Sequence, residues 1–251
     1  MRLDGRIALV TGASSGFGRR LARTLAAAGA DVALTARRED RLAELAAEIQ
    51  ATGRRALAVA MDARDPASIR AAVARAEAEL GPIDVLLNNA GIAVQKPAAE
   101  FTEEDYREQM GTNLDGAWFC AQEVGKRMIA RGKGGKIVNM ASMLAQKAVP
   151  QLALYCMSKA AMVQMTRCLA LEWARHDIQV NAILPGYIET EMNGPYWASE
   201  AGKTFMKKFP RRRVGEGHEL DELTLLLSGP GSGFMTGSII LVDDGQSLMG
   251  Y

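Results

Sequence analysis

The sequence has little of what marks several common classes of protein. Its three cysteines, Cys120, Cys156 and Cys168, show no paired spacing and have no histidine at ligand distance along the chain. A disulfide framework and a zinc site of the usual spacing are therefore not expected. We predict reduced, mostly buried thiols and no bound metal.

Charge of one sign and long apolar runs are lacking as well. The formal net charge is +1, so the charge balance does not call for nucleic acid or an acidic membrane surface as a partner. No stretch approaches the roughly 20 apolar residues of a membrane span. Residues 1–6 lead into an apolar run without a cleavable signal segment. These features predict a cytoplasmic protein with no membrane partner.

What the chain does have is a steady alternation of short apolar runs and amphipathic segments over 251 residues. Continuous apolar runs are typical of strands that are covered on both faces of a sheet. Strands are expected at 7–10, 31–35, 56–61, 83–87, 136–140, 178–184 and 238–242. Helices are expected at 18–28, 41–52, 66–80, 102–131 (broken near 111–113), 152–175 and 220–227.

This alternation predicts an α/β fold with a single Rossmann-type domain over residues 1–251. Its doubly wound parallel β-sheet would be flanked by helices on both faces, with right-handed crossovers. One irregular stretch, 190–213, interrupts the alternation. We expect this stretch to form a mobile lid over the substrate.

A glycine-rich loop lies between the first expected strand and helix, with Gly12, Gly16 and Gly18 in the spacing G-x-x-x-G-x-G. Gly12 can turn sharply, Gly16 lets a phosphate approach the backbone, and Gly18 lets the helix lie close to the strand. The free N–H groups and positive dipole of the helix N-terminus suit a pyrophosphate. The loop therefore predicts a dinucleotide site, with a purely structural turn as the alternative.

The end of the second expected strand predicts which dinucleotide is bound. An acidic residue at this place accepts from the 2′-hydroxyl of NAD, whereas a basic residue pairs with the 2′-phosphate of NADP. Here Arg37 and Arg38 occupy the place, and the first acid is Glu39. Because guanidinium groups match phosphate geometry, NADP(H) is favoured over NAD(H). The alternative is that both arginines belong to a solvated turn.

Tyr155 and Lys159 are the first candidates for proton chemistry, since residues i and i+4 share one helix face. A free phenol has a pKa of about 10, and a nearby ammonium and a positively charged nicotinamide ring would lower it. Tyr155 could then give a proton to an alkoxide or take one from an alcohol. Ser142, after the fifth strand, would hold the substrate oxygen. The alternative is an ordinary half-buried helix face.

Six features in one order carry a resemblance to a known family: the glycine loop, 88–91, Asn113, Ser142, 155–159 and 185–186. Together they resemble the short-chain dehydrogenase/reductase family, in its branch of this length, over nearly the whole chain. The resemblance implies the catalytic set Asn113, Ser142, Tyr155 and Lys159. It further implies that Lys159 binds the nicotinamide ribose and that Asn113 helps to hold a proton-relay water.

The resemblance also implies cofactor contacts after the later strands. Asp62 would meet the adenine amino group, with an N-cap role as its alternative, and the backbone of Ile188 and Thr190 would contact carboxamide and phosphate. The whole predicted cofactor set is Gly12, Ser14, Ser15, Gly16, Phe17, Gly18, Arg37, Arg38, Asp62, Ala63, Asn89, Ala90, Gly91, Tyr155, Lys159, Pro185, Gly186, Ile188 and Thr190.

Aromatic and methionine side chains dominate the expected substrate pocket. They favour an apolar or ring-bearing ketone, unless they only pack the lid onto the core. The predicted substrate residues are Ser142, Leu144, Gln151, Leu152, Tyr155, Tyr187, Met192 and Trp197, with Met143, Tyr196 and Phe205 as further candidates.

The leading hypothesis is a ketone reductase or secondary-alcohol dehydrogenase that prefers NADP. A 3-oxoacyl-[acyl-carrier-protein] reductase is the first alternative, with a basic dock for the carrier near the entrance formed by Arg127, Arg131, Lys133 and Arg175. A non-catalytic NADP-sensing protein is the second alternative. Members of the family that drift in that direction often lose the tyrosine or the lysine, and both are present here.

The resemblance implies a homotetramer, or a dimer, with contacts through 102–131, 152–175 and the last strand. Two positions depart from the family pattern. Ser15 stands where many NADP-preferring members carry a basic residue, and Asp243-Asp244-Gly245 replaces the usual Asp-Gly-Gly. We expect the second departure to affect assembly more than chemistry.

Overall fold

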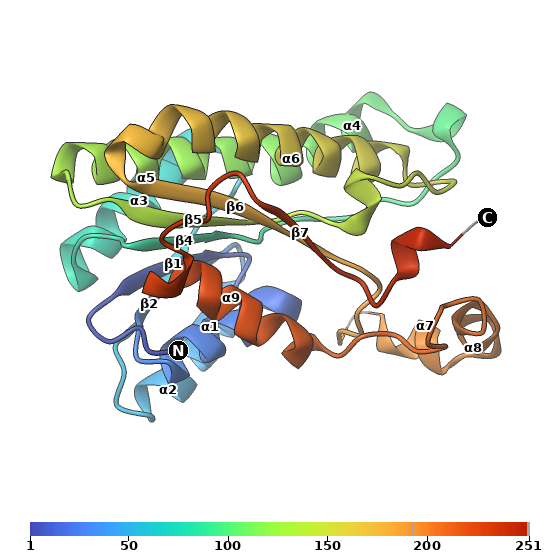
Figure 1. The fold of residues 1–251 in the computed structure, drawn as a ribbon, viewed down its shortest axis with the longest axis horizontal. Coiled ribbons are helices and arrows are strands. Elements are labelled where there is room, and N and C mark those ends of the chain that lie inside the picture. The colour runs from blue at the N-terminus through green and yellow to red at the C-terminus, as the bar shows by residue number, and fades with distance from the viewer. Residues whose placement is uncertain (192, 250–251) are drawn as a thin grey trace.

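A computed structural model describes residues 1–191 and 193–249. Its centre is a parallel sheet in the order β3-β2-β1-β4-β5-β6-β7 (Figure 1). The chain therefore adds β2 and β3 on one side of β1 and the strands from β4 onward on the other side. This order confirms the doubly wound fold. The strands are β1 Ile7–Thr11, β2 Asp31–Ala36, β3 Ala56–Ala60, β4 Val85–Asn88, β5 Gly135–Met140, β6 Ile178–Pro185 and β7 Ile239–Val242.

Helices cover both faces of the sheet (Figure 1). On one face lie α3, α5 and α6, on the other α1, α2 and α9, and α7 and α8 lie beyond one end of the sheet. The helices are α1 Gly16–Ala27, α2 Glu39–Gln50, α3 Pro66–Leu80, α4 Glu103–Met110, α5 Gly116–Arg131, α6 Ala153–Trp173, α7 Gly194–Ala198, α8 Glu200–Met206 and α9 Asp221–Ser228.

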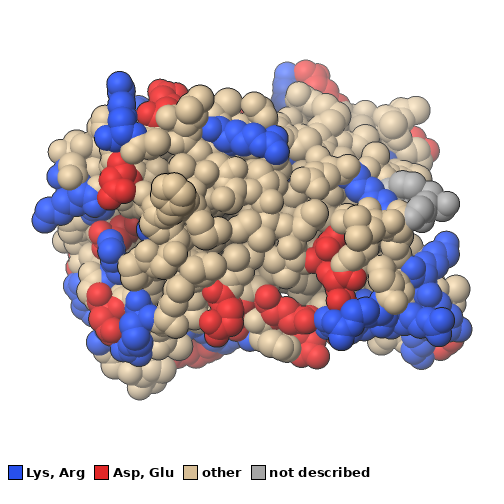
Figure 2. Space-filling view, in the orientation of Figure 1, with Lys and Arg blue, Asp and Glu red and all other residues tan. Residues whose placement is uncertain are grey.

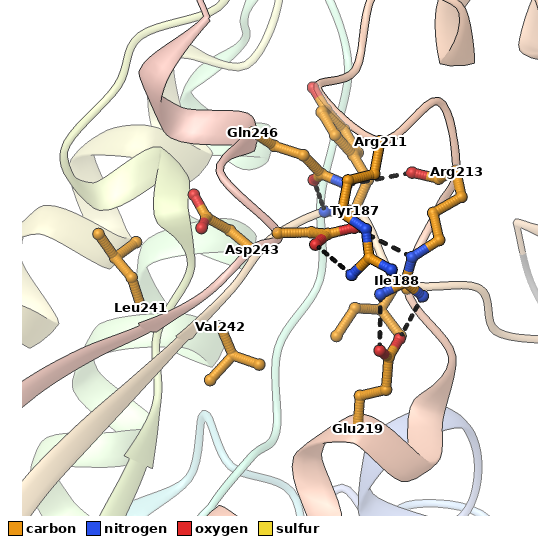
Figure 3. Close-up of a pocket in the computed structure, with 11 residues that line it drawn as sticks. Tyr187, Ile188, Arg211, Arg213, Glu219, Leu241, Val242, Asp243 and Gln246 are labelled. Carbon is orange, nitrogen blue, oxygen red and sulfur yellow. Dashed lines mark hydrogen bonds and ion pairs between the residues drawn. The ribbon is translucent and has the colours of Figure 1, made fainter.

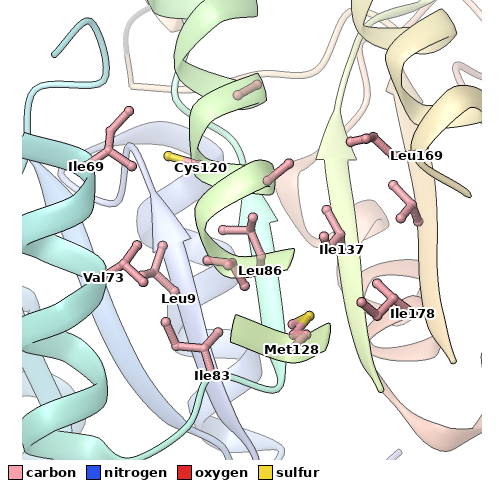
Figure 4. Packing of buried hydrophobic residues seen from close by; sticks show 14 of the residues in the cluster. Leu9, Ile69, Val73, Ile83, Leu86, Cys120, Met128, Ile137, Leu169 and Ile178 are labelled. Carbon is pink, nitrogen blue, oxygen red and sulfur yellow. The ribbon is translucent and has the colours of Figure 1, made fainter. Parts of the chain in front are cut away.

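Two apolar cores, one on each face of the sheet, explain why the strands are apolar throughout. Successive residues of a strand point to opposite faces. Leu9 therefore packs with Leu86 and Ile137 beneath α3, α5 and α6 (Figure 4), whereas Ala8 and Val10 pack against the helices on the other face. All five of these side chains are fully buried. Double coverage leaves the loops at the strand ends as the place for a site.

Two expectations about irregular backbone are wrong. The helix predicted to break near 111–113 continues through a π-helical turn, Gly111–Asp115, so α4 and α5 stay joined. The stretch 190–213 is not irregular throughout, because it contains α7 and α8. Pro195 lies in the first turn of α7, and the Ser199 hydroxyl caps α8 by accepting from the Gly202 amide. Both are ordinary helix-start signals.

The cysteines are all free, but they are not mostly buried. Only Cys120 is buried, which raises the pKa of its thiol to about 12, while Cys156 is partly covered and Cys168 is exposed. Cys168 lies on the exposed face of α6. Its neighbours in the sequence are alanines and leucines, so its exposure could not be predicted from them. Within residues 1–191 and 193–249, no cluster of metal-ligating side chains and no helix able to cross a membrane is found.

Candidate active site

The glycine loop between β1 and α1 forms one wall of the site. A β-carbon at Gly12, where φ is +67°, would lie 2.8 Å from the Ala90 Cα atom, and one at Gly18 would lie 2.3 Å from the Gly12 carbonyl oxygen. Gly16 has φ +53° and open space where a side chain would be. Ser15 makes no side-chain cap, so the first amides of α1 keep their N–H groups for a ligand. The loop thus combines close packing with an open anion-binding face.

A hydrogen-bonded bridge joins this loop to the segment after β4. The Thr11 hydroxyl accepts from the amides of Asn89 (2.9 Å) and Ala90 (3.0 Å), and the Asn89 side chain donates to the Thr11 carbonyl at 3.0 Å. Asn88 is buried and donates to Asn139 at 3.0 Å, which makes it a structural residue. The 88–91 motif therefore holds two loops of the site at a fixed separation.

Basic side chains gather at the end of β2, as predicted. Arg38 donates to the hydroxyls of Ser14 at 3.0 Å and Ser15 at 2.9 Å, so its guanidinium lies against the glycine loop. Asp62 pairs with Arg64, whose hydrogen bond lowers the pKa of that carboxyl group. The N-cap alternative for Asp62 is wrong, because Asp65 caps α3 by accepting from the Ala67 amide at 2.8 Å.

One cleft of about 720 Å³ connects these features with Tyr155 and Lys159. Every predicted cofactor residue lines it except Gly18, Gly186 and Ile188, and Ile188 lines a separate cavity instead. Sequence reasoning missed the cleft residues Ala36, Met61, Ile92, Ala93, Thr112, Met140, Ala141 and Asn193. Most of them are apolar neighbours of predicted residues and carry no chemical signal. Asn193 is polar, and in the structure its side chain accepts a hydrogen bond from the amide of the predicted residue Thr190 at 2.7 Å.

Ser142, Tyr155 and Lys159 converge at the carboxyl end of β5. A hydrogen bond with Ser142 works to lower the pKa of Tyr155, but burial outweighs it and raises this pKa above its usual value. The Lys159 ammonium donates to the Met140 carbonyl at 2.7 Å and lies 5.7 Å from the centre of the Tyr155 ring. Burial lowers the pKa of Lys159 to about 8.

The expected lowering of the Tyr155 pKa is therefore not a property of the protein chain by itself. Lys159 lies beside the phenol, but its ammonium group donates to the Met140 backbone carbonyl. Burial desolvates both Tyr155 and Lys159. Burial disfavours the charged form of each group. In the chain alone, Tyr155 is consequently held as a neutral phenol, which is a proton donor.

Asn113 is fully buried in the π-helical turn and faces the loop after β4. Its side chain accepts from the Ile92 amide at 2.8 Å and donates to the Ile92 carbonyl at 2.9 Å and to Ser158 at 3.1 Å. A β-carbon at Gly91 would lie 3.4 Å from Asn113 and 3.5 Å from Lys159. Asn113 thus fixes the loop beside Lys159, and its role toward a proton-relay water stays a prediction.

The predicted substrate residues divide into two groups. Tyr187 stacks on Phe209 with ring centres 5.4 Å apart, and Trp197 is only 6% exposed. The aromatic side chains of the lid therefore pack on Tyr187 and on one another. Gln151 is exposed and accepts from Gln95 at 3.2 Å. Of the remaining candidates, Met143 and Leu144 are buried, Leu152 and Phe205 are partly covered, Tyr196 is exposed, and Met192 lies outside the described residues.

The basic dock expected near the entrance lies elsewhere. Arg127 pairs with Glu77 and Glu123, and Arg131 lies 3.4 Å from Asp84, which immediately precedes β4. This is the amino edge of the sheet, opposite to the edge where Ser142 follows β5. Lys133 and Arg175 also lie at segments that lead into strands. The dock prediction is wrong because charges that are close in sequence were assigned to the wrong sheet edge.

Comparisons with known proteins point to one family. The family model described as short chain dehydrogenase matches residues 6–201. Gluconate 5-dehydrogenase of Gluconobacter oxydans is 38% identical over 247 residues, covering 98% of this chain and 96% of that protein. NAD-dependent glycerol dehydrogenase of Listeria innocua is 38% identical over 98% of this chain and 95% of its own.

A solved structure gives the same result. The gluconate 5-dehydrogenase of Burkholderia cenocepacia in complex with NADP and tartrate superimposes with a TM-score of 0.94 at 39% identity. The match covers 99% of this chain and 98% of that one. Both the fold and its full length are therefore shared.

Proposed function

The chain belongs to the short-chain dehydrogenase/reductase family, and we propose that it uses Tyr155 to move the proton in its reaction. It is a nicotinamide-dependent oxidoreductase that interconverts a ketone and a secondary alcohol. The observation that carries the proposal is the convergence of Ser142, Tyr155 and Lys159 at the carboxyl end of β5. Ser142 is hydrogen-bonded to Tyr155, and Tyr155 and Lys159 line the cleft that begins at the glycine loop.

Each side chain of the site has a defined task in the proposed reaction. The bound nicotinamide ring would supply or accept the hydride at the substrate carbon. Ser142 holds the substrate oxygen, and Tyr155 gives that oxygen its phenolic proton during reduction. In oxidation the phenolate takes the alcohol proton back. Lys159 stabilises the phenolate by its charge, and Asn113 keeps the adjoining loop in place.

For the cofactor we propose NADP(H) in preference to NAD(H). Arg38 is already oriented by Ser14 and Ser15, and Arg37 lines the same cleft, so two guanidinium groups are available to a 2′-phosphate. The open face at Gly16 fits the pyrophosphate. NADP in the Burkholderia structure supports this choice, while the NAD-dependent Listeria relative keeps NAD as the competing cofactor.

For the substrate we propose a polyhydroxy compound, a sugar acid before a neutral alditol. Relatives act on gluconate, D-threitol and galactitol. The lid aromatics do not argue for an apolar ketone, because they are occupied with one another. Exposed Lys207, Lys208 and Arg212 give the lid a positive surface, visible where α7 and α8 lie (Figure 2), and this surface favours a carboxylate.

The proposal is tested with one panel assay that follows the reduced cofactor. Gluconate, galactitol, threitol, glycerol and a 3-oxoacyl thioester are each supplied with NADP or NAD in the appropriate redox state. We expect turnover of the hydroxyl-rich compounds, with gluconate ahead of galactitol and more strongly inhibited by salt. Turnover of the thioester alone would favour the acyl-carrier alternative. Tight NADPH binding without turnover of any compound would favour a sensor.

We also propose that the protein forms a homotetramer. Trp118 on α5 is 38% exposed and Leu171 on α6 is 84% exposed. Largely uncharged surface lies over β7, where Leu241 is 39% exposed (Figure 2). Exposed apolar surface of this kind suits subunit contacts. Light scattering at micromolar concentration should give four times the monomer mass, and a monomer would contradict the proposal. Cytoplasmic location stays a prediction.

A further inference from the structure

The C-terminal turn, residues 243–249, connects three segments that surround the proposed active site. It follows β7 and reaches the end of the molecule where α7 and α8 lie (Figure 1). Its contacts extend to the segment after β6, to the end of the lid and to the loop that precedes α6. None of these contacts is local in sequence, apart from those that shape the turn itself.

Gln246 makes the first of these connections. Its side chain is 1% exposed, and its Oε1 atom accepts from the Tyr187 amide at 2.7 Å, as Figure 3 shows. Its Nε2 atom points to the Arg213 carbonyl at 3.5 Å. A β-carbon at Gly186 would lie 2.5 Å from the same Oε1 atom. A buried amide that pairs with backbone on both sides is costly to replace, so Gln246 locks the segment after β6.

Asp244 makes the second connection and gives a role to the departure from Asp-Gly-Gly. It adopts φ +53°, a conformation that glycine takes without strain. Its carboxylate pairs with Arg211 at 3.0 Å and with Arg213 at 3.0 Å. Arg213 also pairs with Glu219 at 2.7 Å. These contacts join the turn to the lid within one chain, and the expected effect on assembly stays a prediction.

The segment that follows the lid is hydrogen-bonded to the segment after β6. Two residues after Arg213, the Gly215 amide donates to the Tyr187 carbonyl at 2.9 Å, and the Gly215 carbonyl accepts from the Glu189 amide at 2.8 Å. On the other side, the Lys147 ammonium donates to the Met249 carbonyl at 2.5 Å. Lys147 belongs to the loop between Ser142 and Tyr155. The turn thus contacts both sides of the reacting centre.

We propose that the C-terminal turn positions residues 186–188, which lie between the cleft residues Pro185 and Thr190, for the nicotinamide half of the cofactor, with Gln246 as the positioning residue. Tyr187, Arg213, Asp244 and Gln246 all line one cavity of about 340 Å³ (Figure 3), so the polar contacts of Gln246 and Asp244 join segments that are not closely packed at this place. The adenosine half of the cofactor, bound near Arg38, lies outside their reach. The inference rests on the proposed function, because it assigns residues 186–188 to the nicotinamide.

Cofactor fragments separate this role from general destabilisation. In Gln246→Ala the dissociation constant of NADPH should rise about tenfold, the effect of one buried donor left unpaired. That of 2′,5′-ADP, which lacks the nicotinamide half, should stay unchanged. Gln246→Glu retains the acceptor for the Tyr187 amide but places an oxygen against the Arg213 carbonyl, so it should recover only part of the affinity. Equal loss for both ligands, or no loss for either, overturns the inference alone. A wild-type protein that binds neither ligand overturns the proposed function with it.

A second pair of variants tests the inference if Gln246→Ala does not fold. Asp244→Gly preserves the left-handed backbone and removes both ion pairs, so KM for substrate should rise about threefold with little change in kcat. Asp177→Gly is the matched control, because Asp177 has φ +56° and precedes β6 at the opposite sheet edge. Indistinguishable kinetics for the two glycine variants would overturn the role of Asp244.

Discussion

The two halves of the cleft are built in different ways. At the adenosine half, the glycine loop meets itself and the 88–91 segment through backbone contacts too close for added side chains at Gly12 and Gly18, and hydrogen bonds of Thr11 and Arg38 add to them. At the lid half, the segment after β6 is held by side chains that arrive from the C-terminal turn and from residues 211–213. The first half is rigid because atoms exclude one another there. The second is held by a few polar contacts.

The difference has an energetic consequence. A methyl group forced into a packed backbone crossing shifts main-chain atoms, whereas an exposed ion pair contributes at most about 1 kcal/mol. Arg211 and Asp244 are a pair of the weaker kind, since the Arg211 side chain is 66% exposed. Substitutions in the adenosine half should therefore reduce stability and binding together. Substitutions in the lid half should change turnover while the fold survives.

The largest effect is expected where the two halves meet. Tyr155→Phe removes the proton donor, so kcat should fall about 1,000-fold, while the dissociation constant of NADPH stays near the wild-type value. The matched control is Tyr106→Phe on α4, because Tyr106 is 45% exposed and does not line the cleft. Steady-state kinetics in both directions measure the change. A Tyr155→Phe enzyme that keeps a tenth of its activity would contradict the mechanism.

The next largest effect tests the rigidity of the adenosine half. In Gly18→Ala the new methyl group would meet the Gly12 carbonyl at 2.3 Å. The clash should lower the free energy of unfolding by about 1–3 kcal/mol and abolish NADPH binding. Gly233→Ala is the control, since its nearest neighbour would be an ordinary 3.5 Å away. Denaturant unfolding compares the two. A Gly18→Ala protein with unchanged stability would show that the loop is looser than its contacts indicate.

A smaller effect is expected for cofactor choice. Arg38→Ala should lower the ratio of kcat/KM for NADP to that for NAD about tenfold, since it removes one charged hydrogen-bonding partner of the 2′-phosphate. Arg41→Ala is the control, because Arg41 lies in the first turn of α2, three residues after Arg38, and pairs at the surface with Glu44. If the ratio is the same in Arg38→Ala and in wild type, the NADP assignment loses its basis.

The smallest effect concerns pH. Lys159 has a pKa of about 8, and burial raises the pKa of Tyr155, so both groups are protonated at neutral pH. Reduction needs a protonated Tyr155 and should be steady below pH 8, then decline as Lys159 loses its charge. Oxidation needs the phenolate and should increase with pH by about threefold per unit, below the ideal tenfold slope of a single group. Parallel pH profiles of kcat/KM in the two directions would contradict this assignment.

The parts of the molecule that sequence reasoning predicted correctly depend on short stretches of chain. Apolar runs predicted every strand, because a strand buried on both faces must be apolar along its length. Gly12 and Gly18 predicted the loop, since only glycine tolerates these crossings. Boundaries moved by one or two residues. Short helices such as α7 and α8 were missed because they span too few turns to show an apolar period.

The parts that sequence reasoning missed depend on partners far along the chain. Gln246 carried no signal, because its partner Tyr187 lies 59 residues away. Arg131 was assigned to the entrance, yet Asp84 binds it at the opposite edge. In the chain alone the pKa of Tyr155 is raised by burial, an effect that sequence reasoning did not include because the degree of burial is a property of the folded chain.

The sequence by itself determined the fold class and the family, and it supplied the residues that we propose handle the proton. These depend on local backbone geometry, on periodic burial and on side-chain chemistry that does not change on folding. Only the tertiary structure decided which groups are charged in the site, which sheet edge each basic residue occupies, and how the C-terminal turn holds the segment after β6. These depend on desolvation and on contacts between distant segments, which the order of residues does not contain.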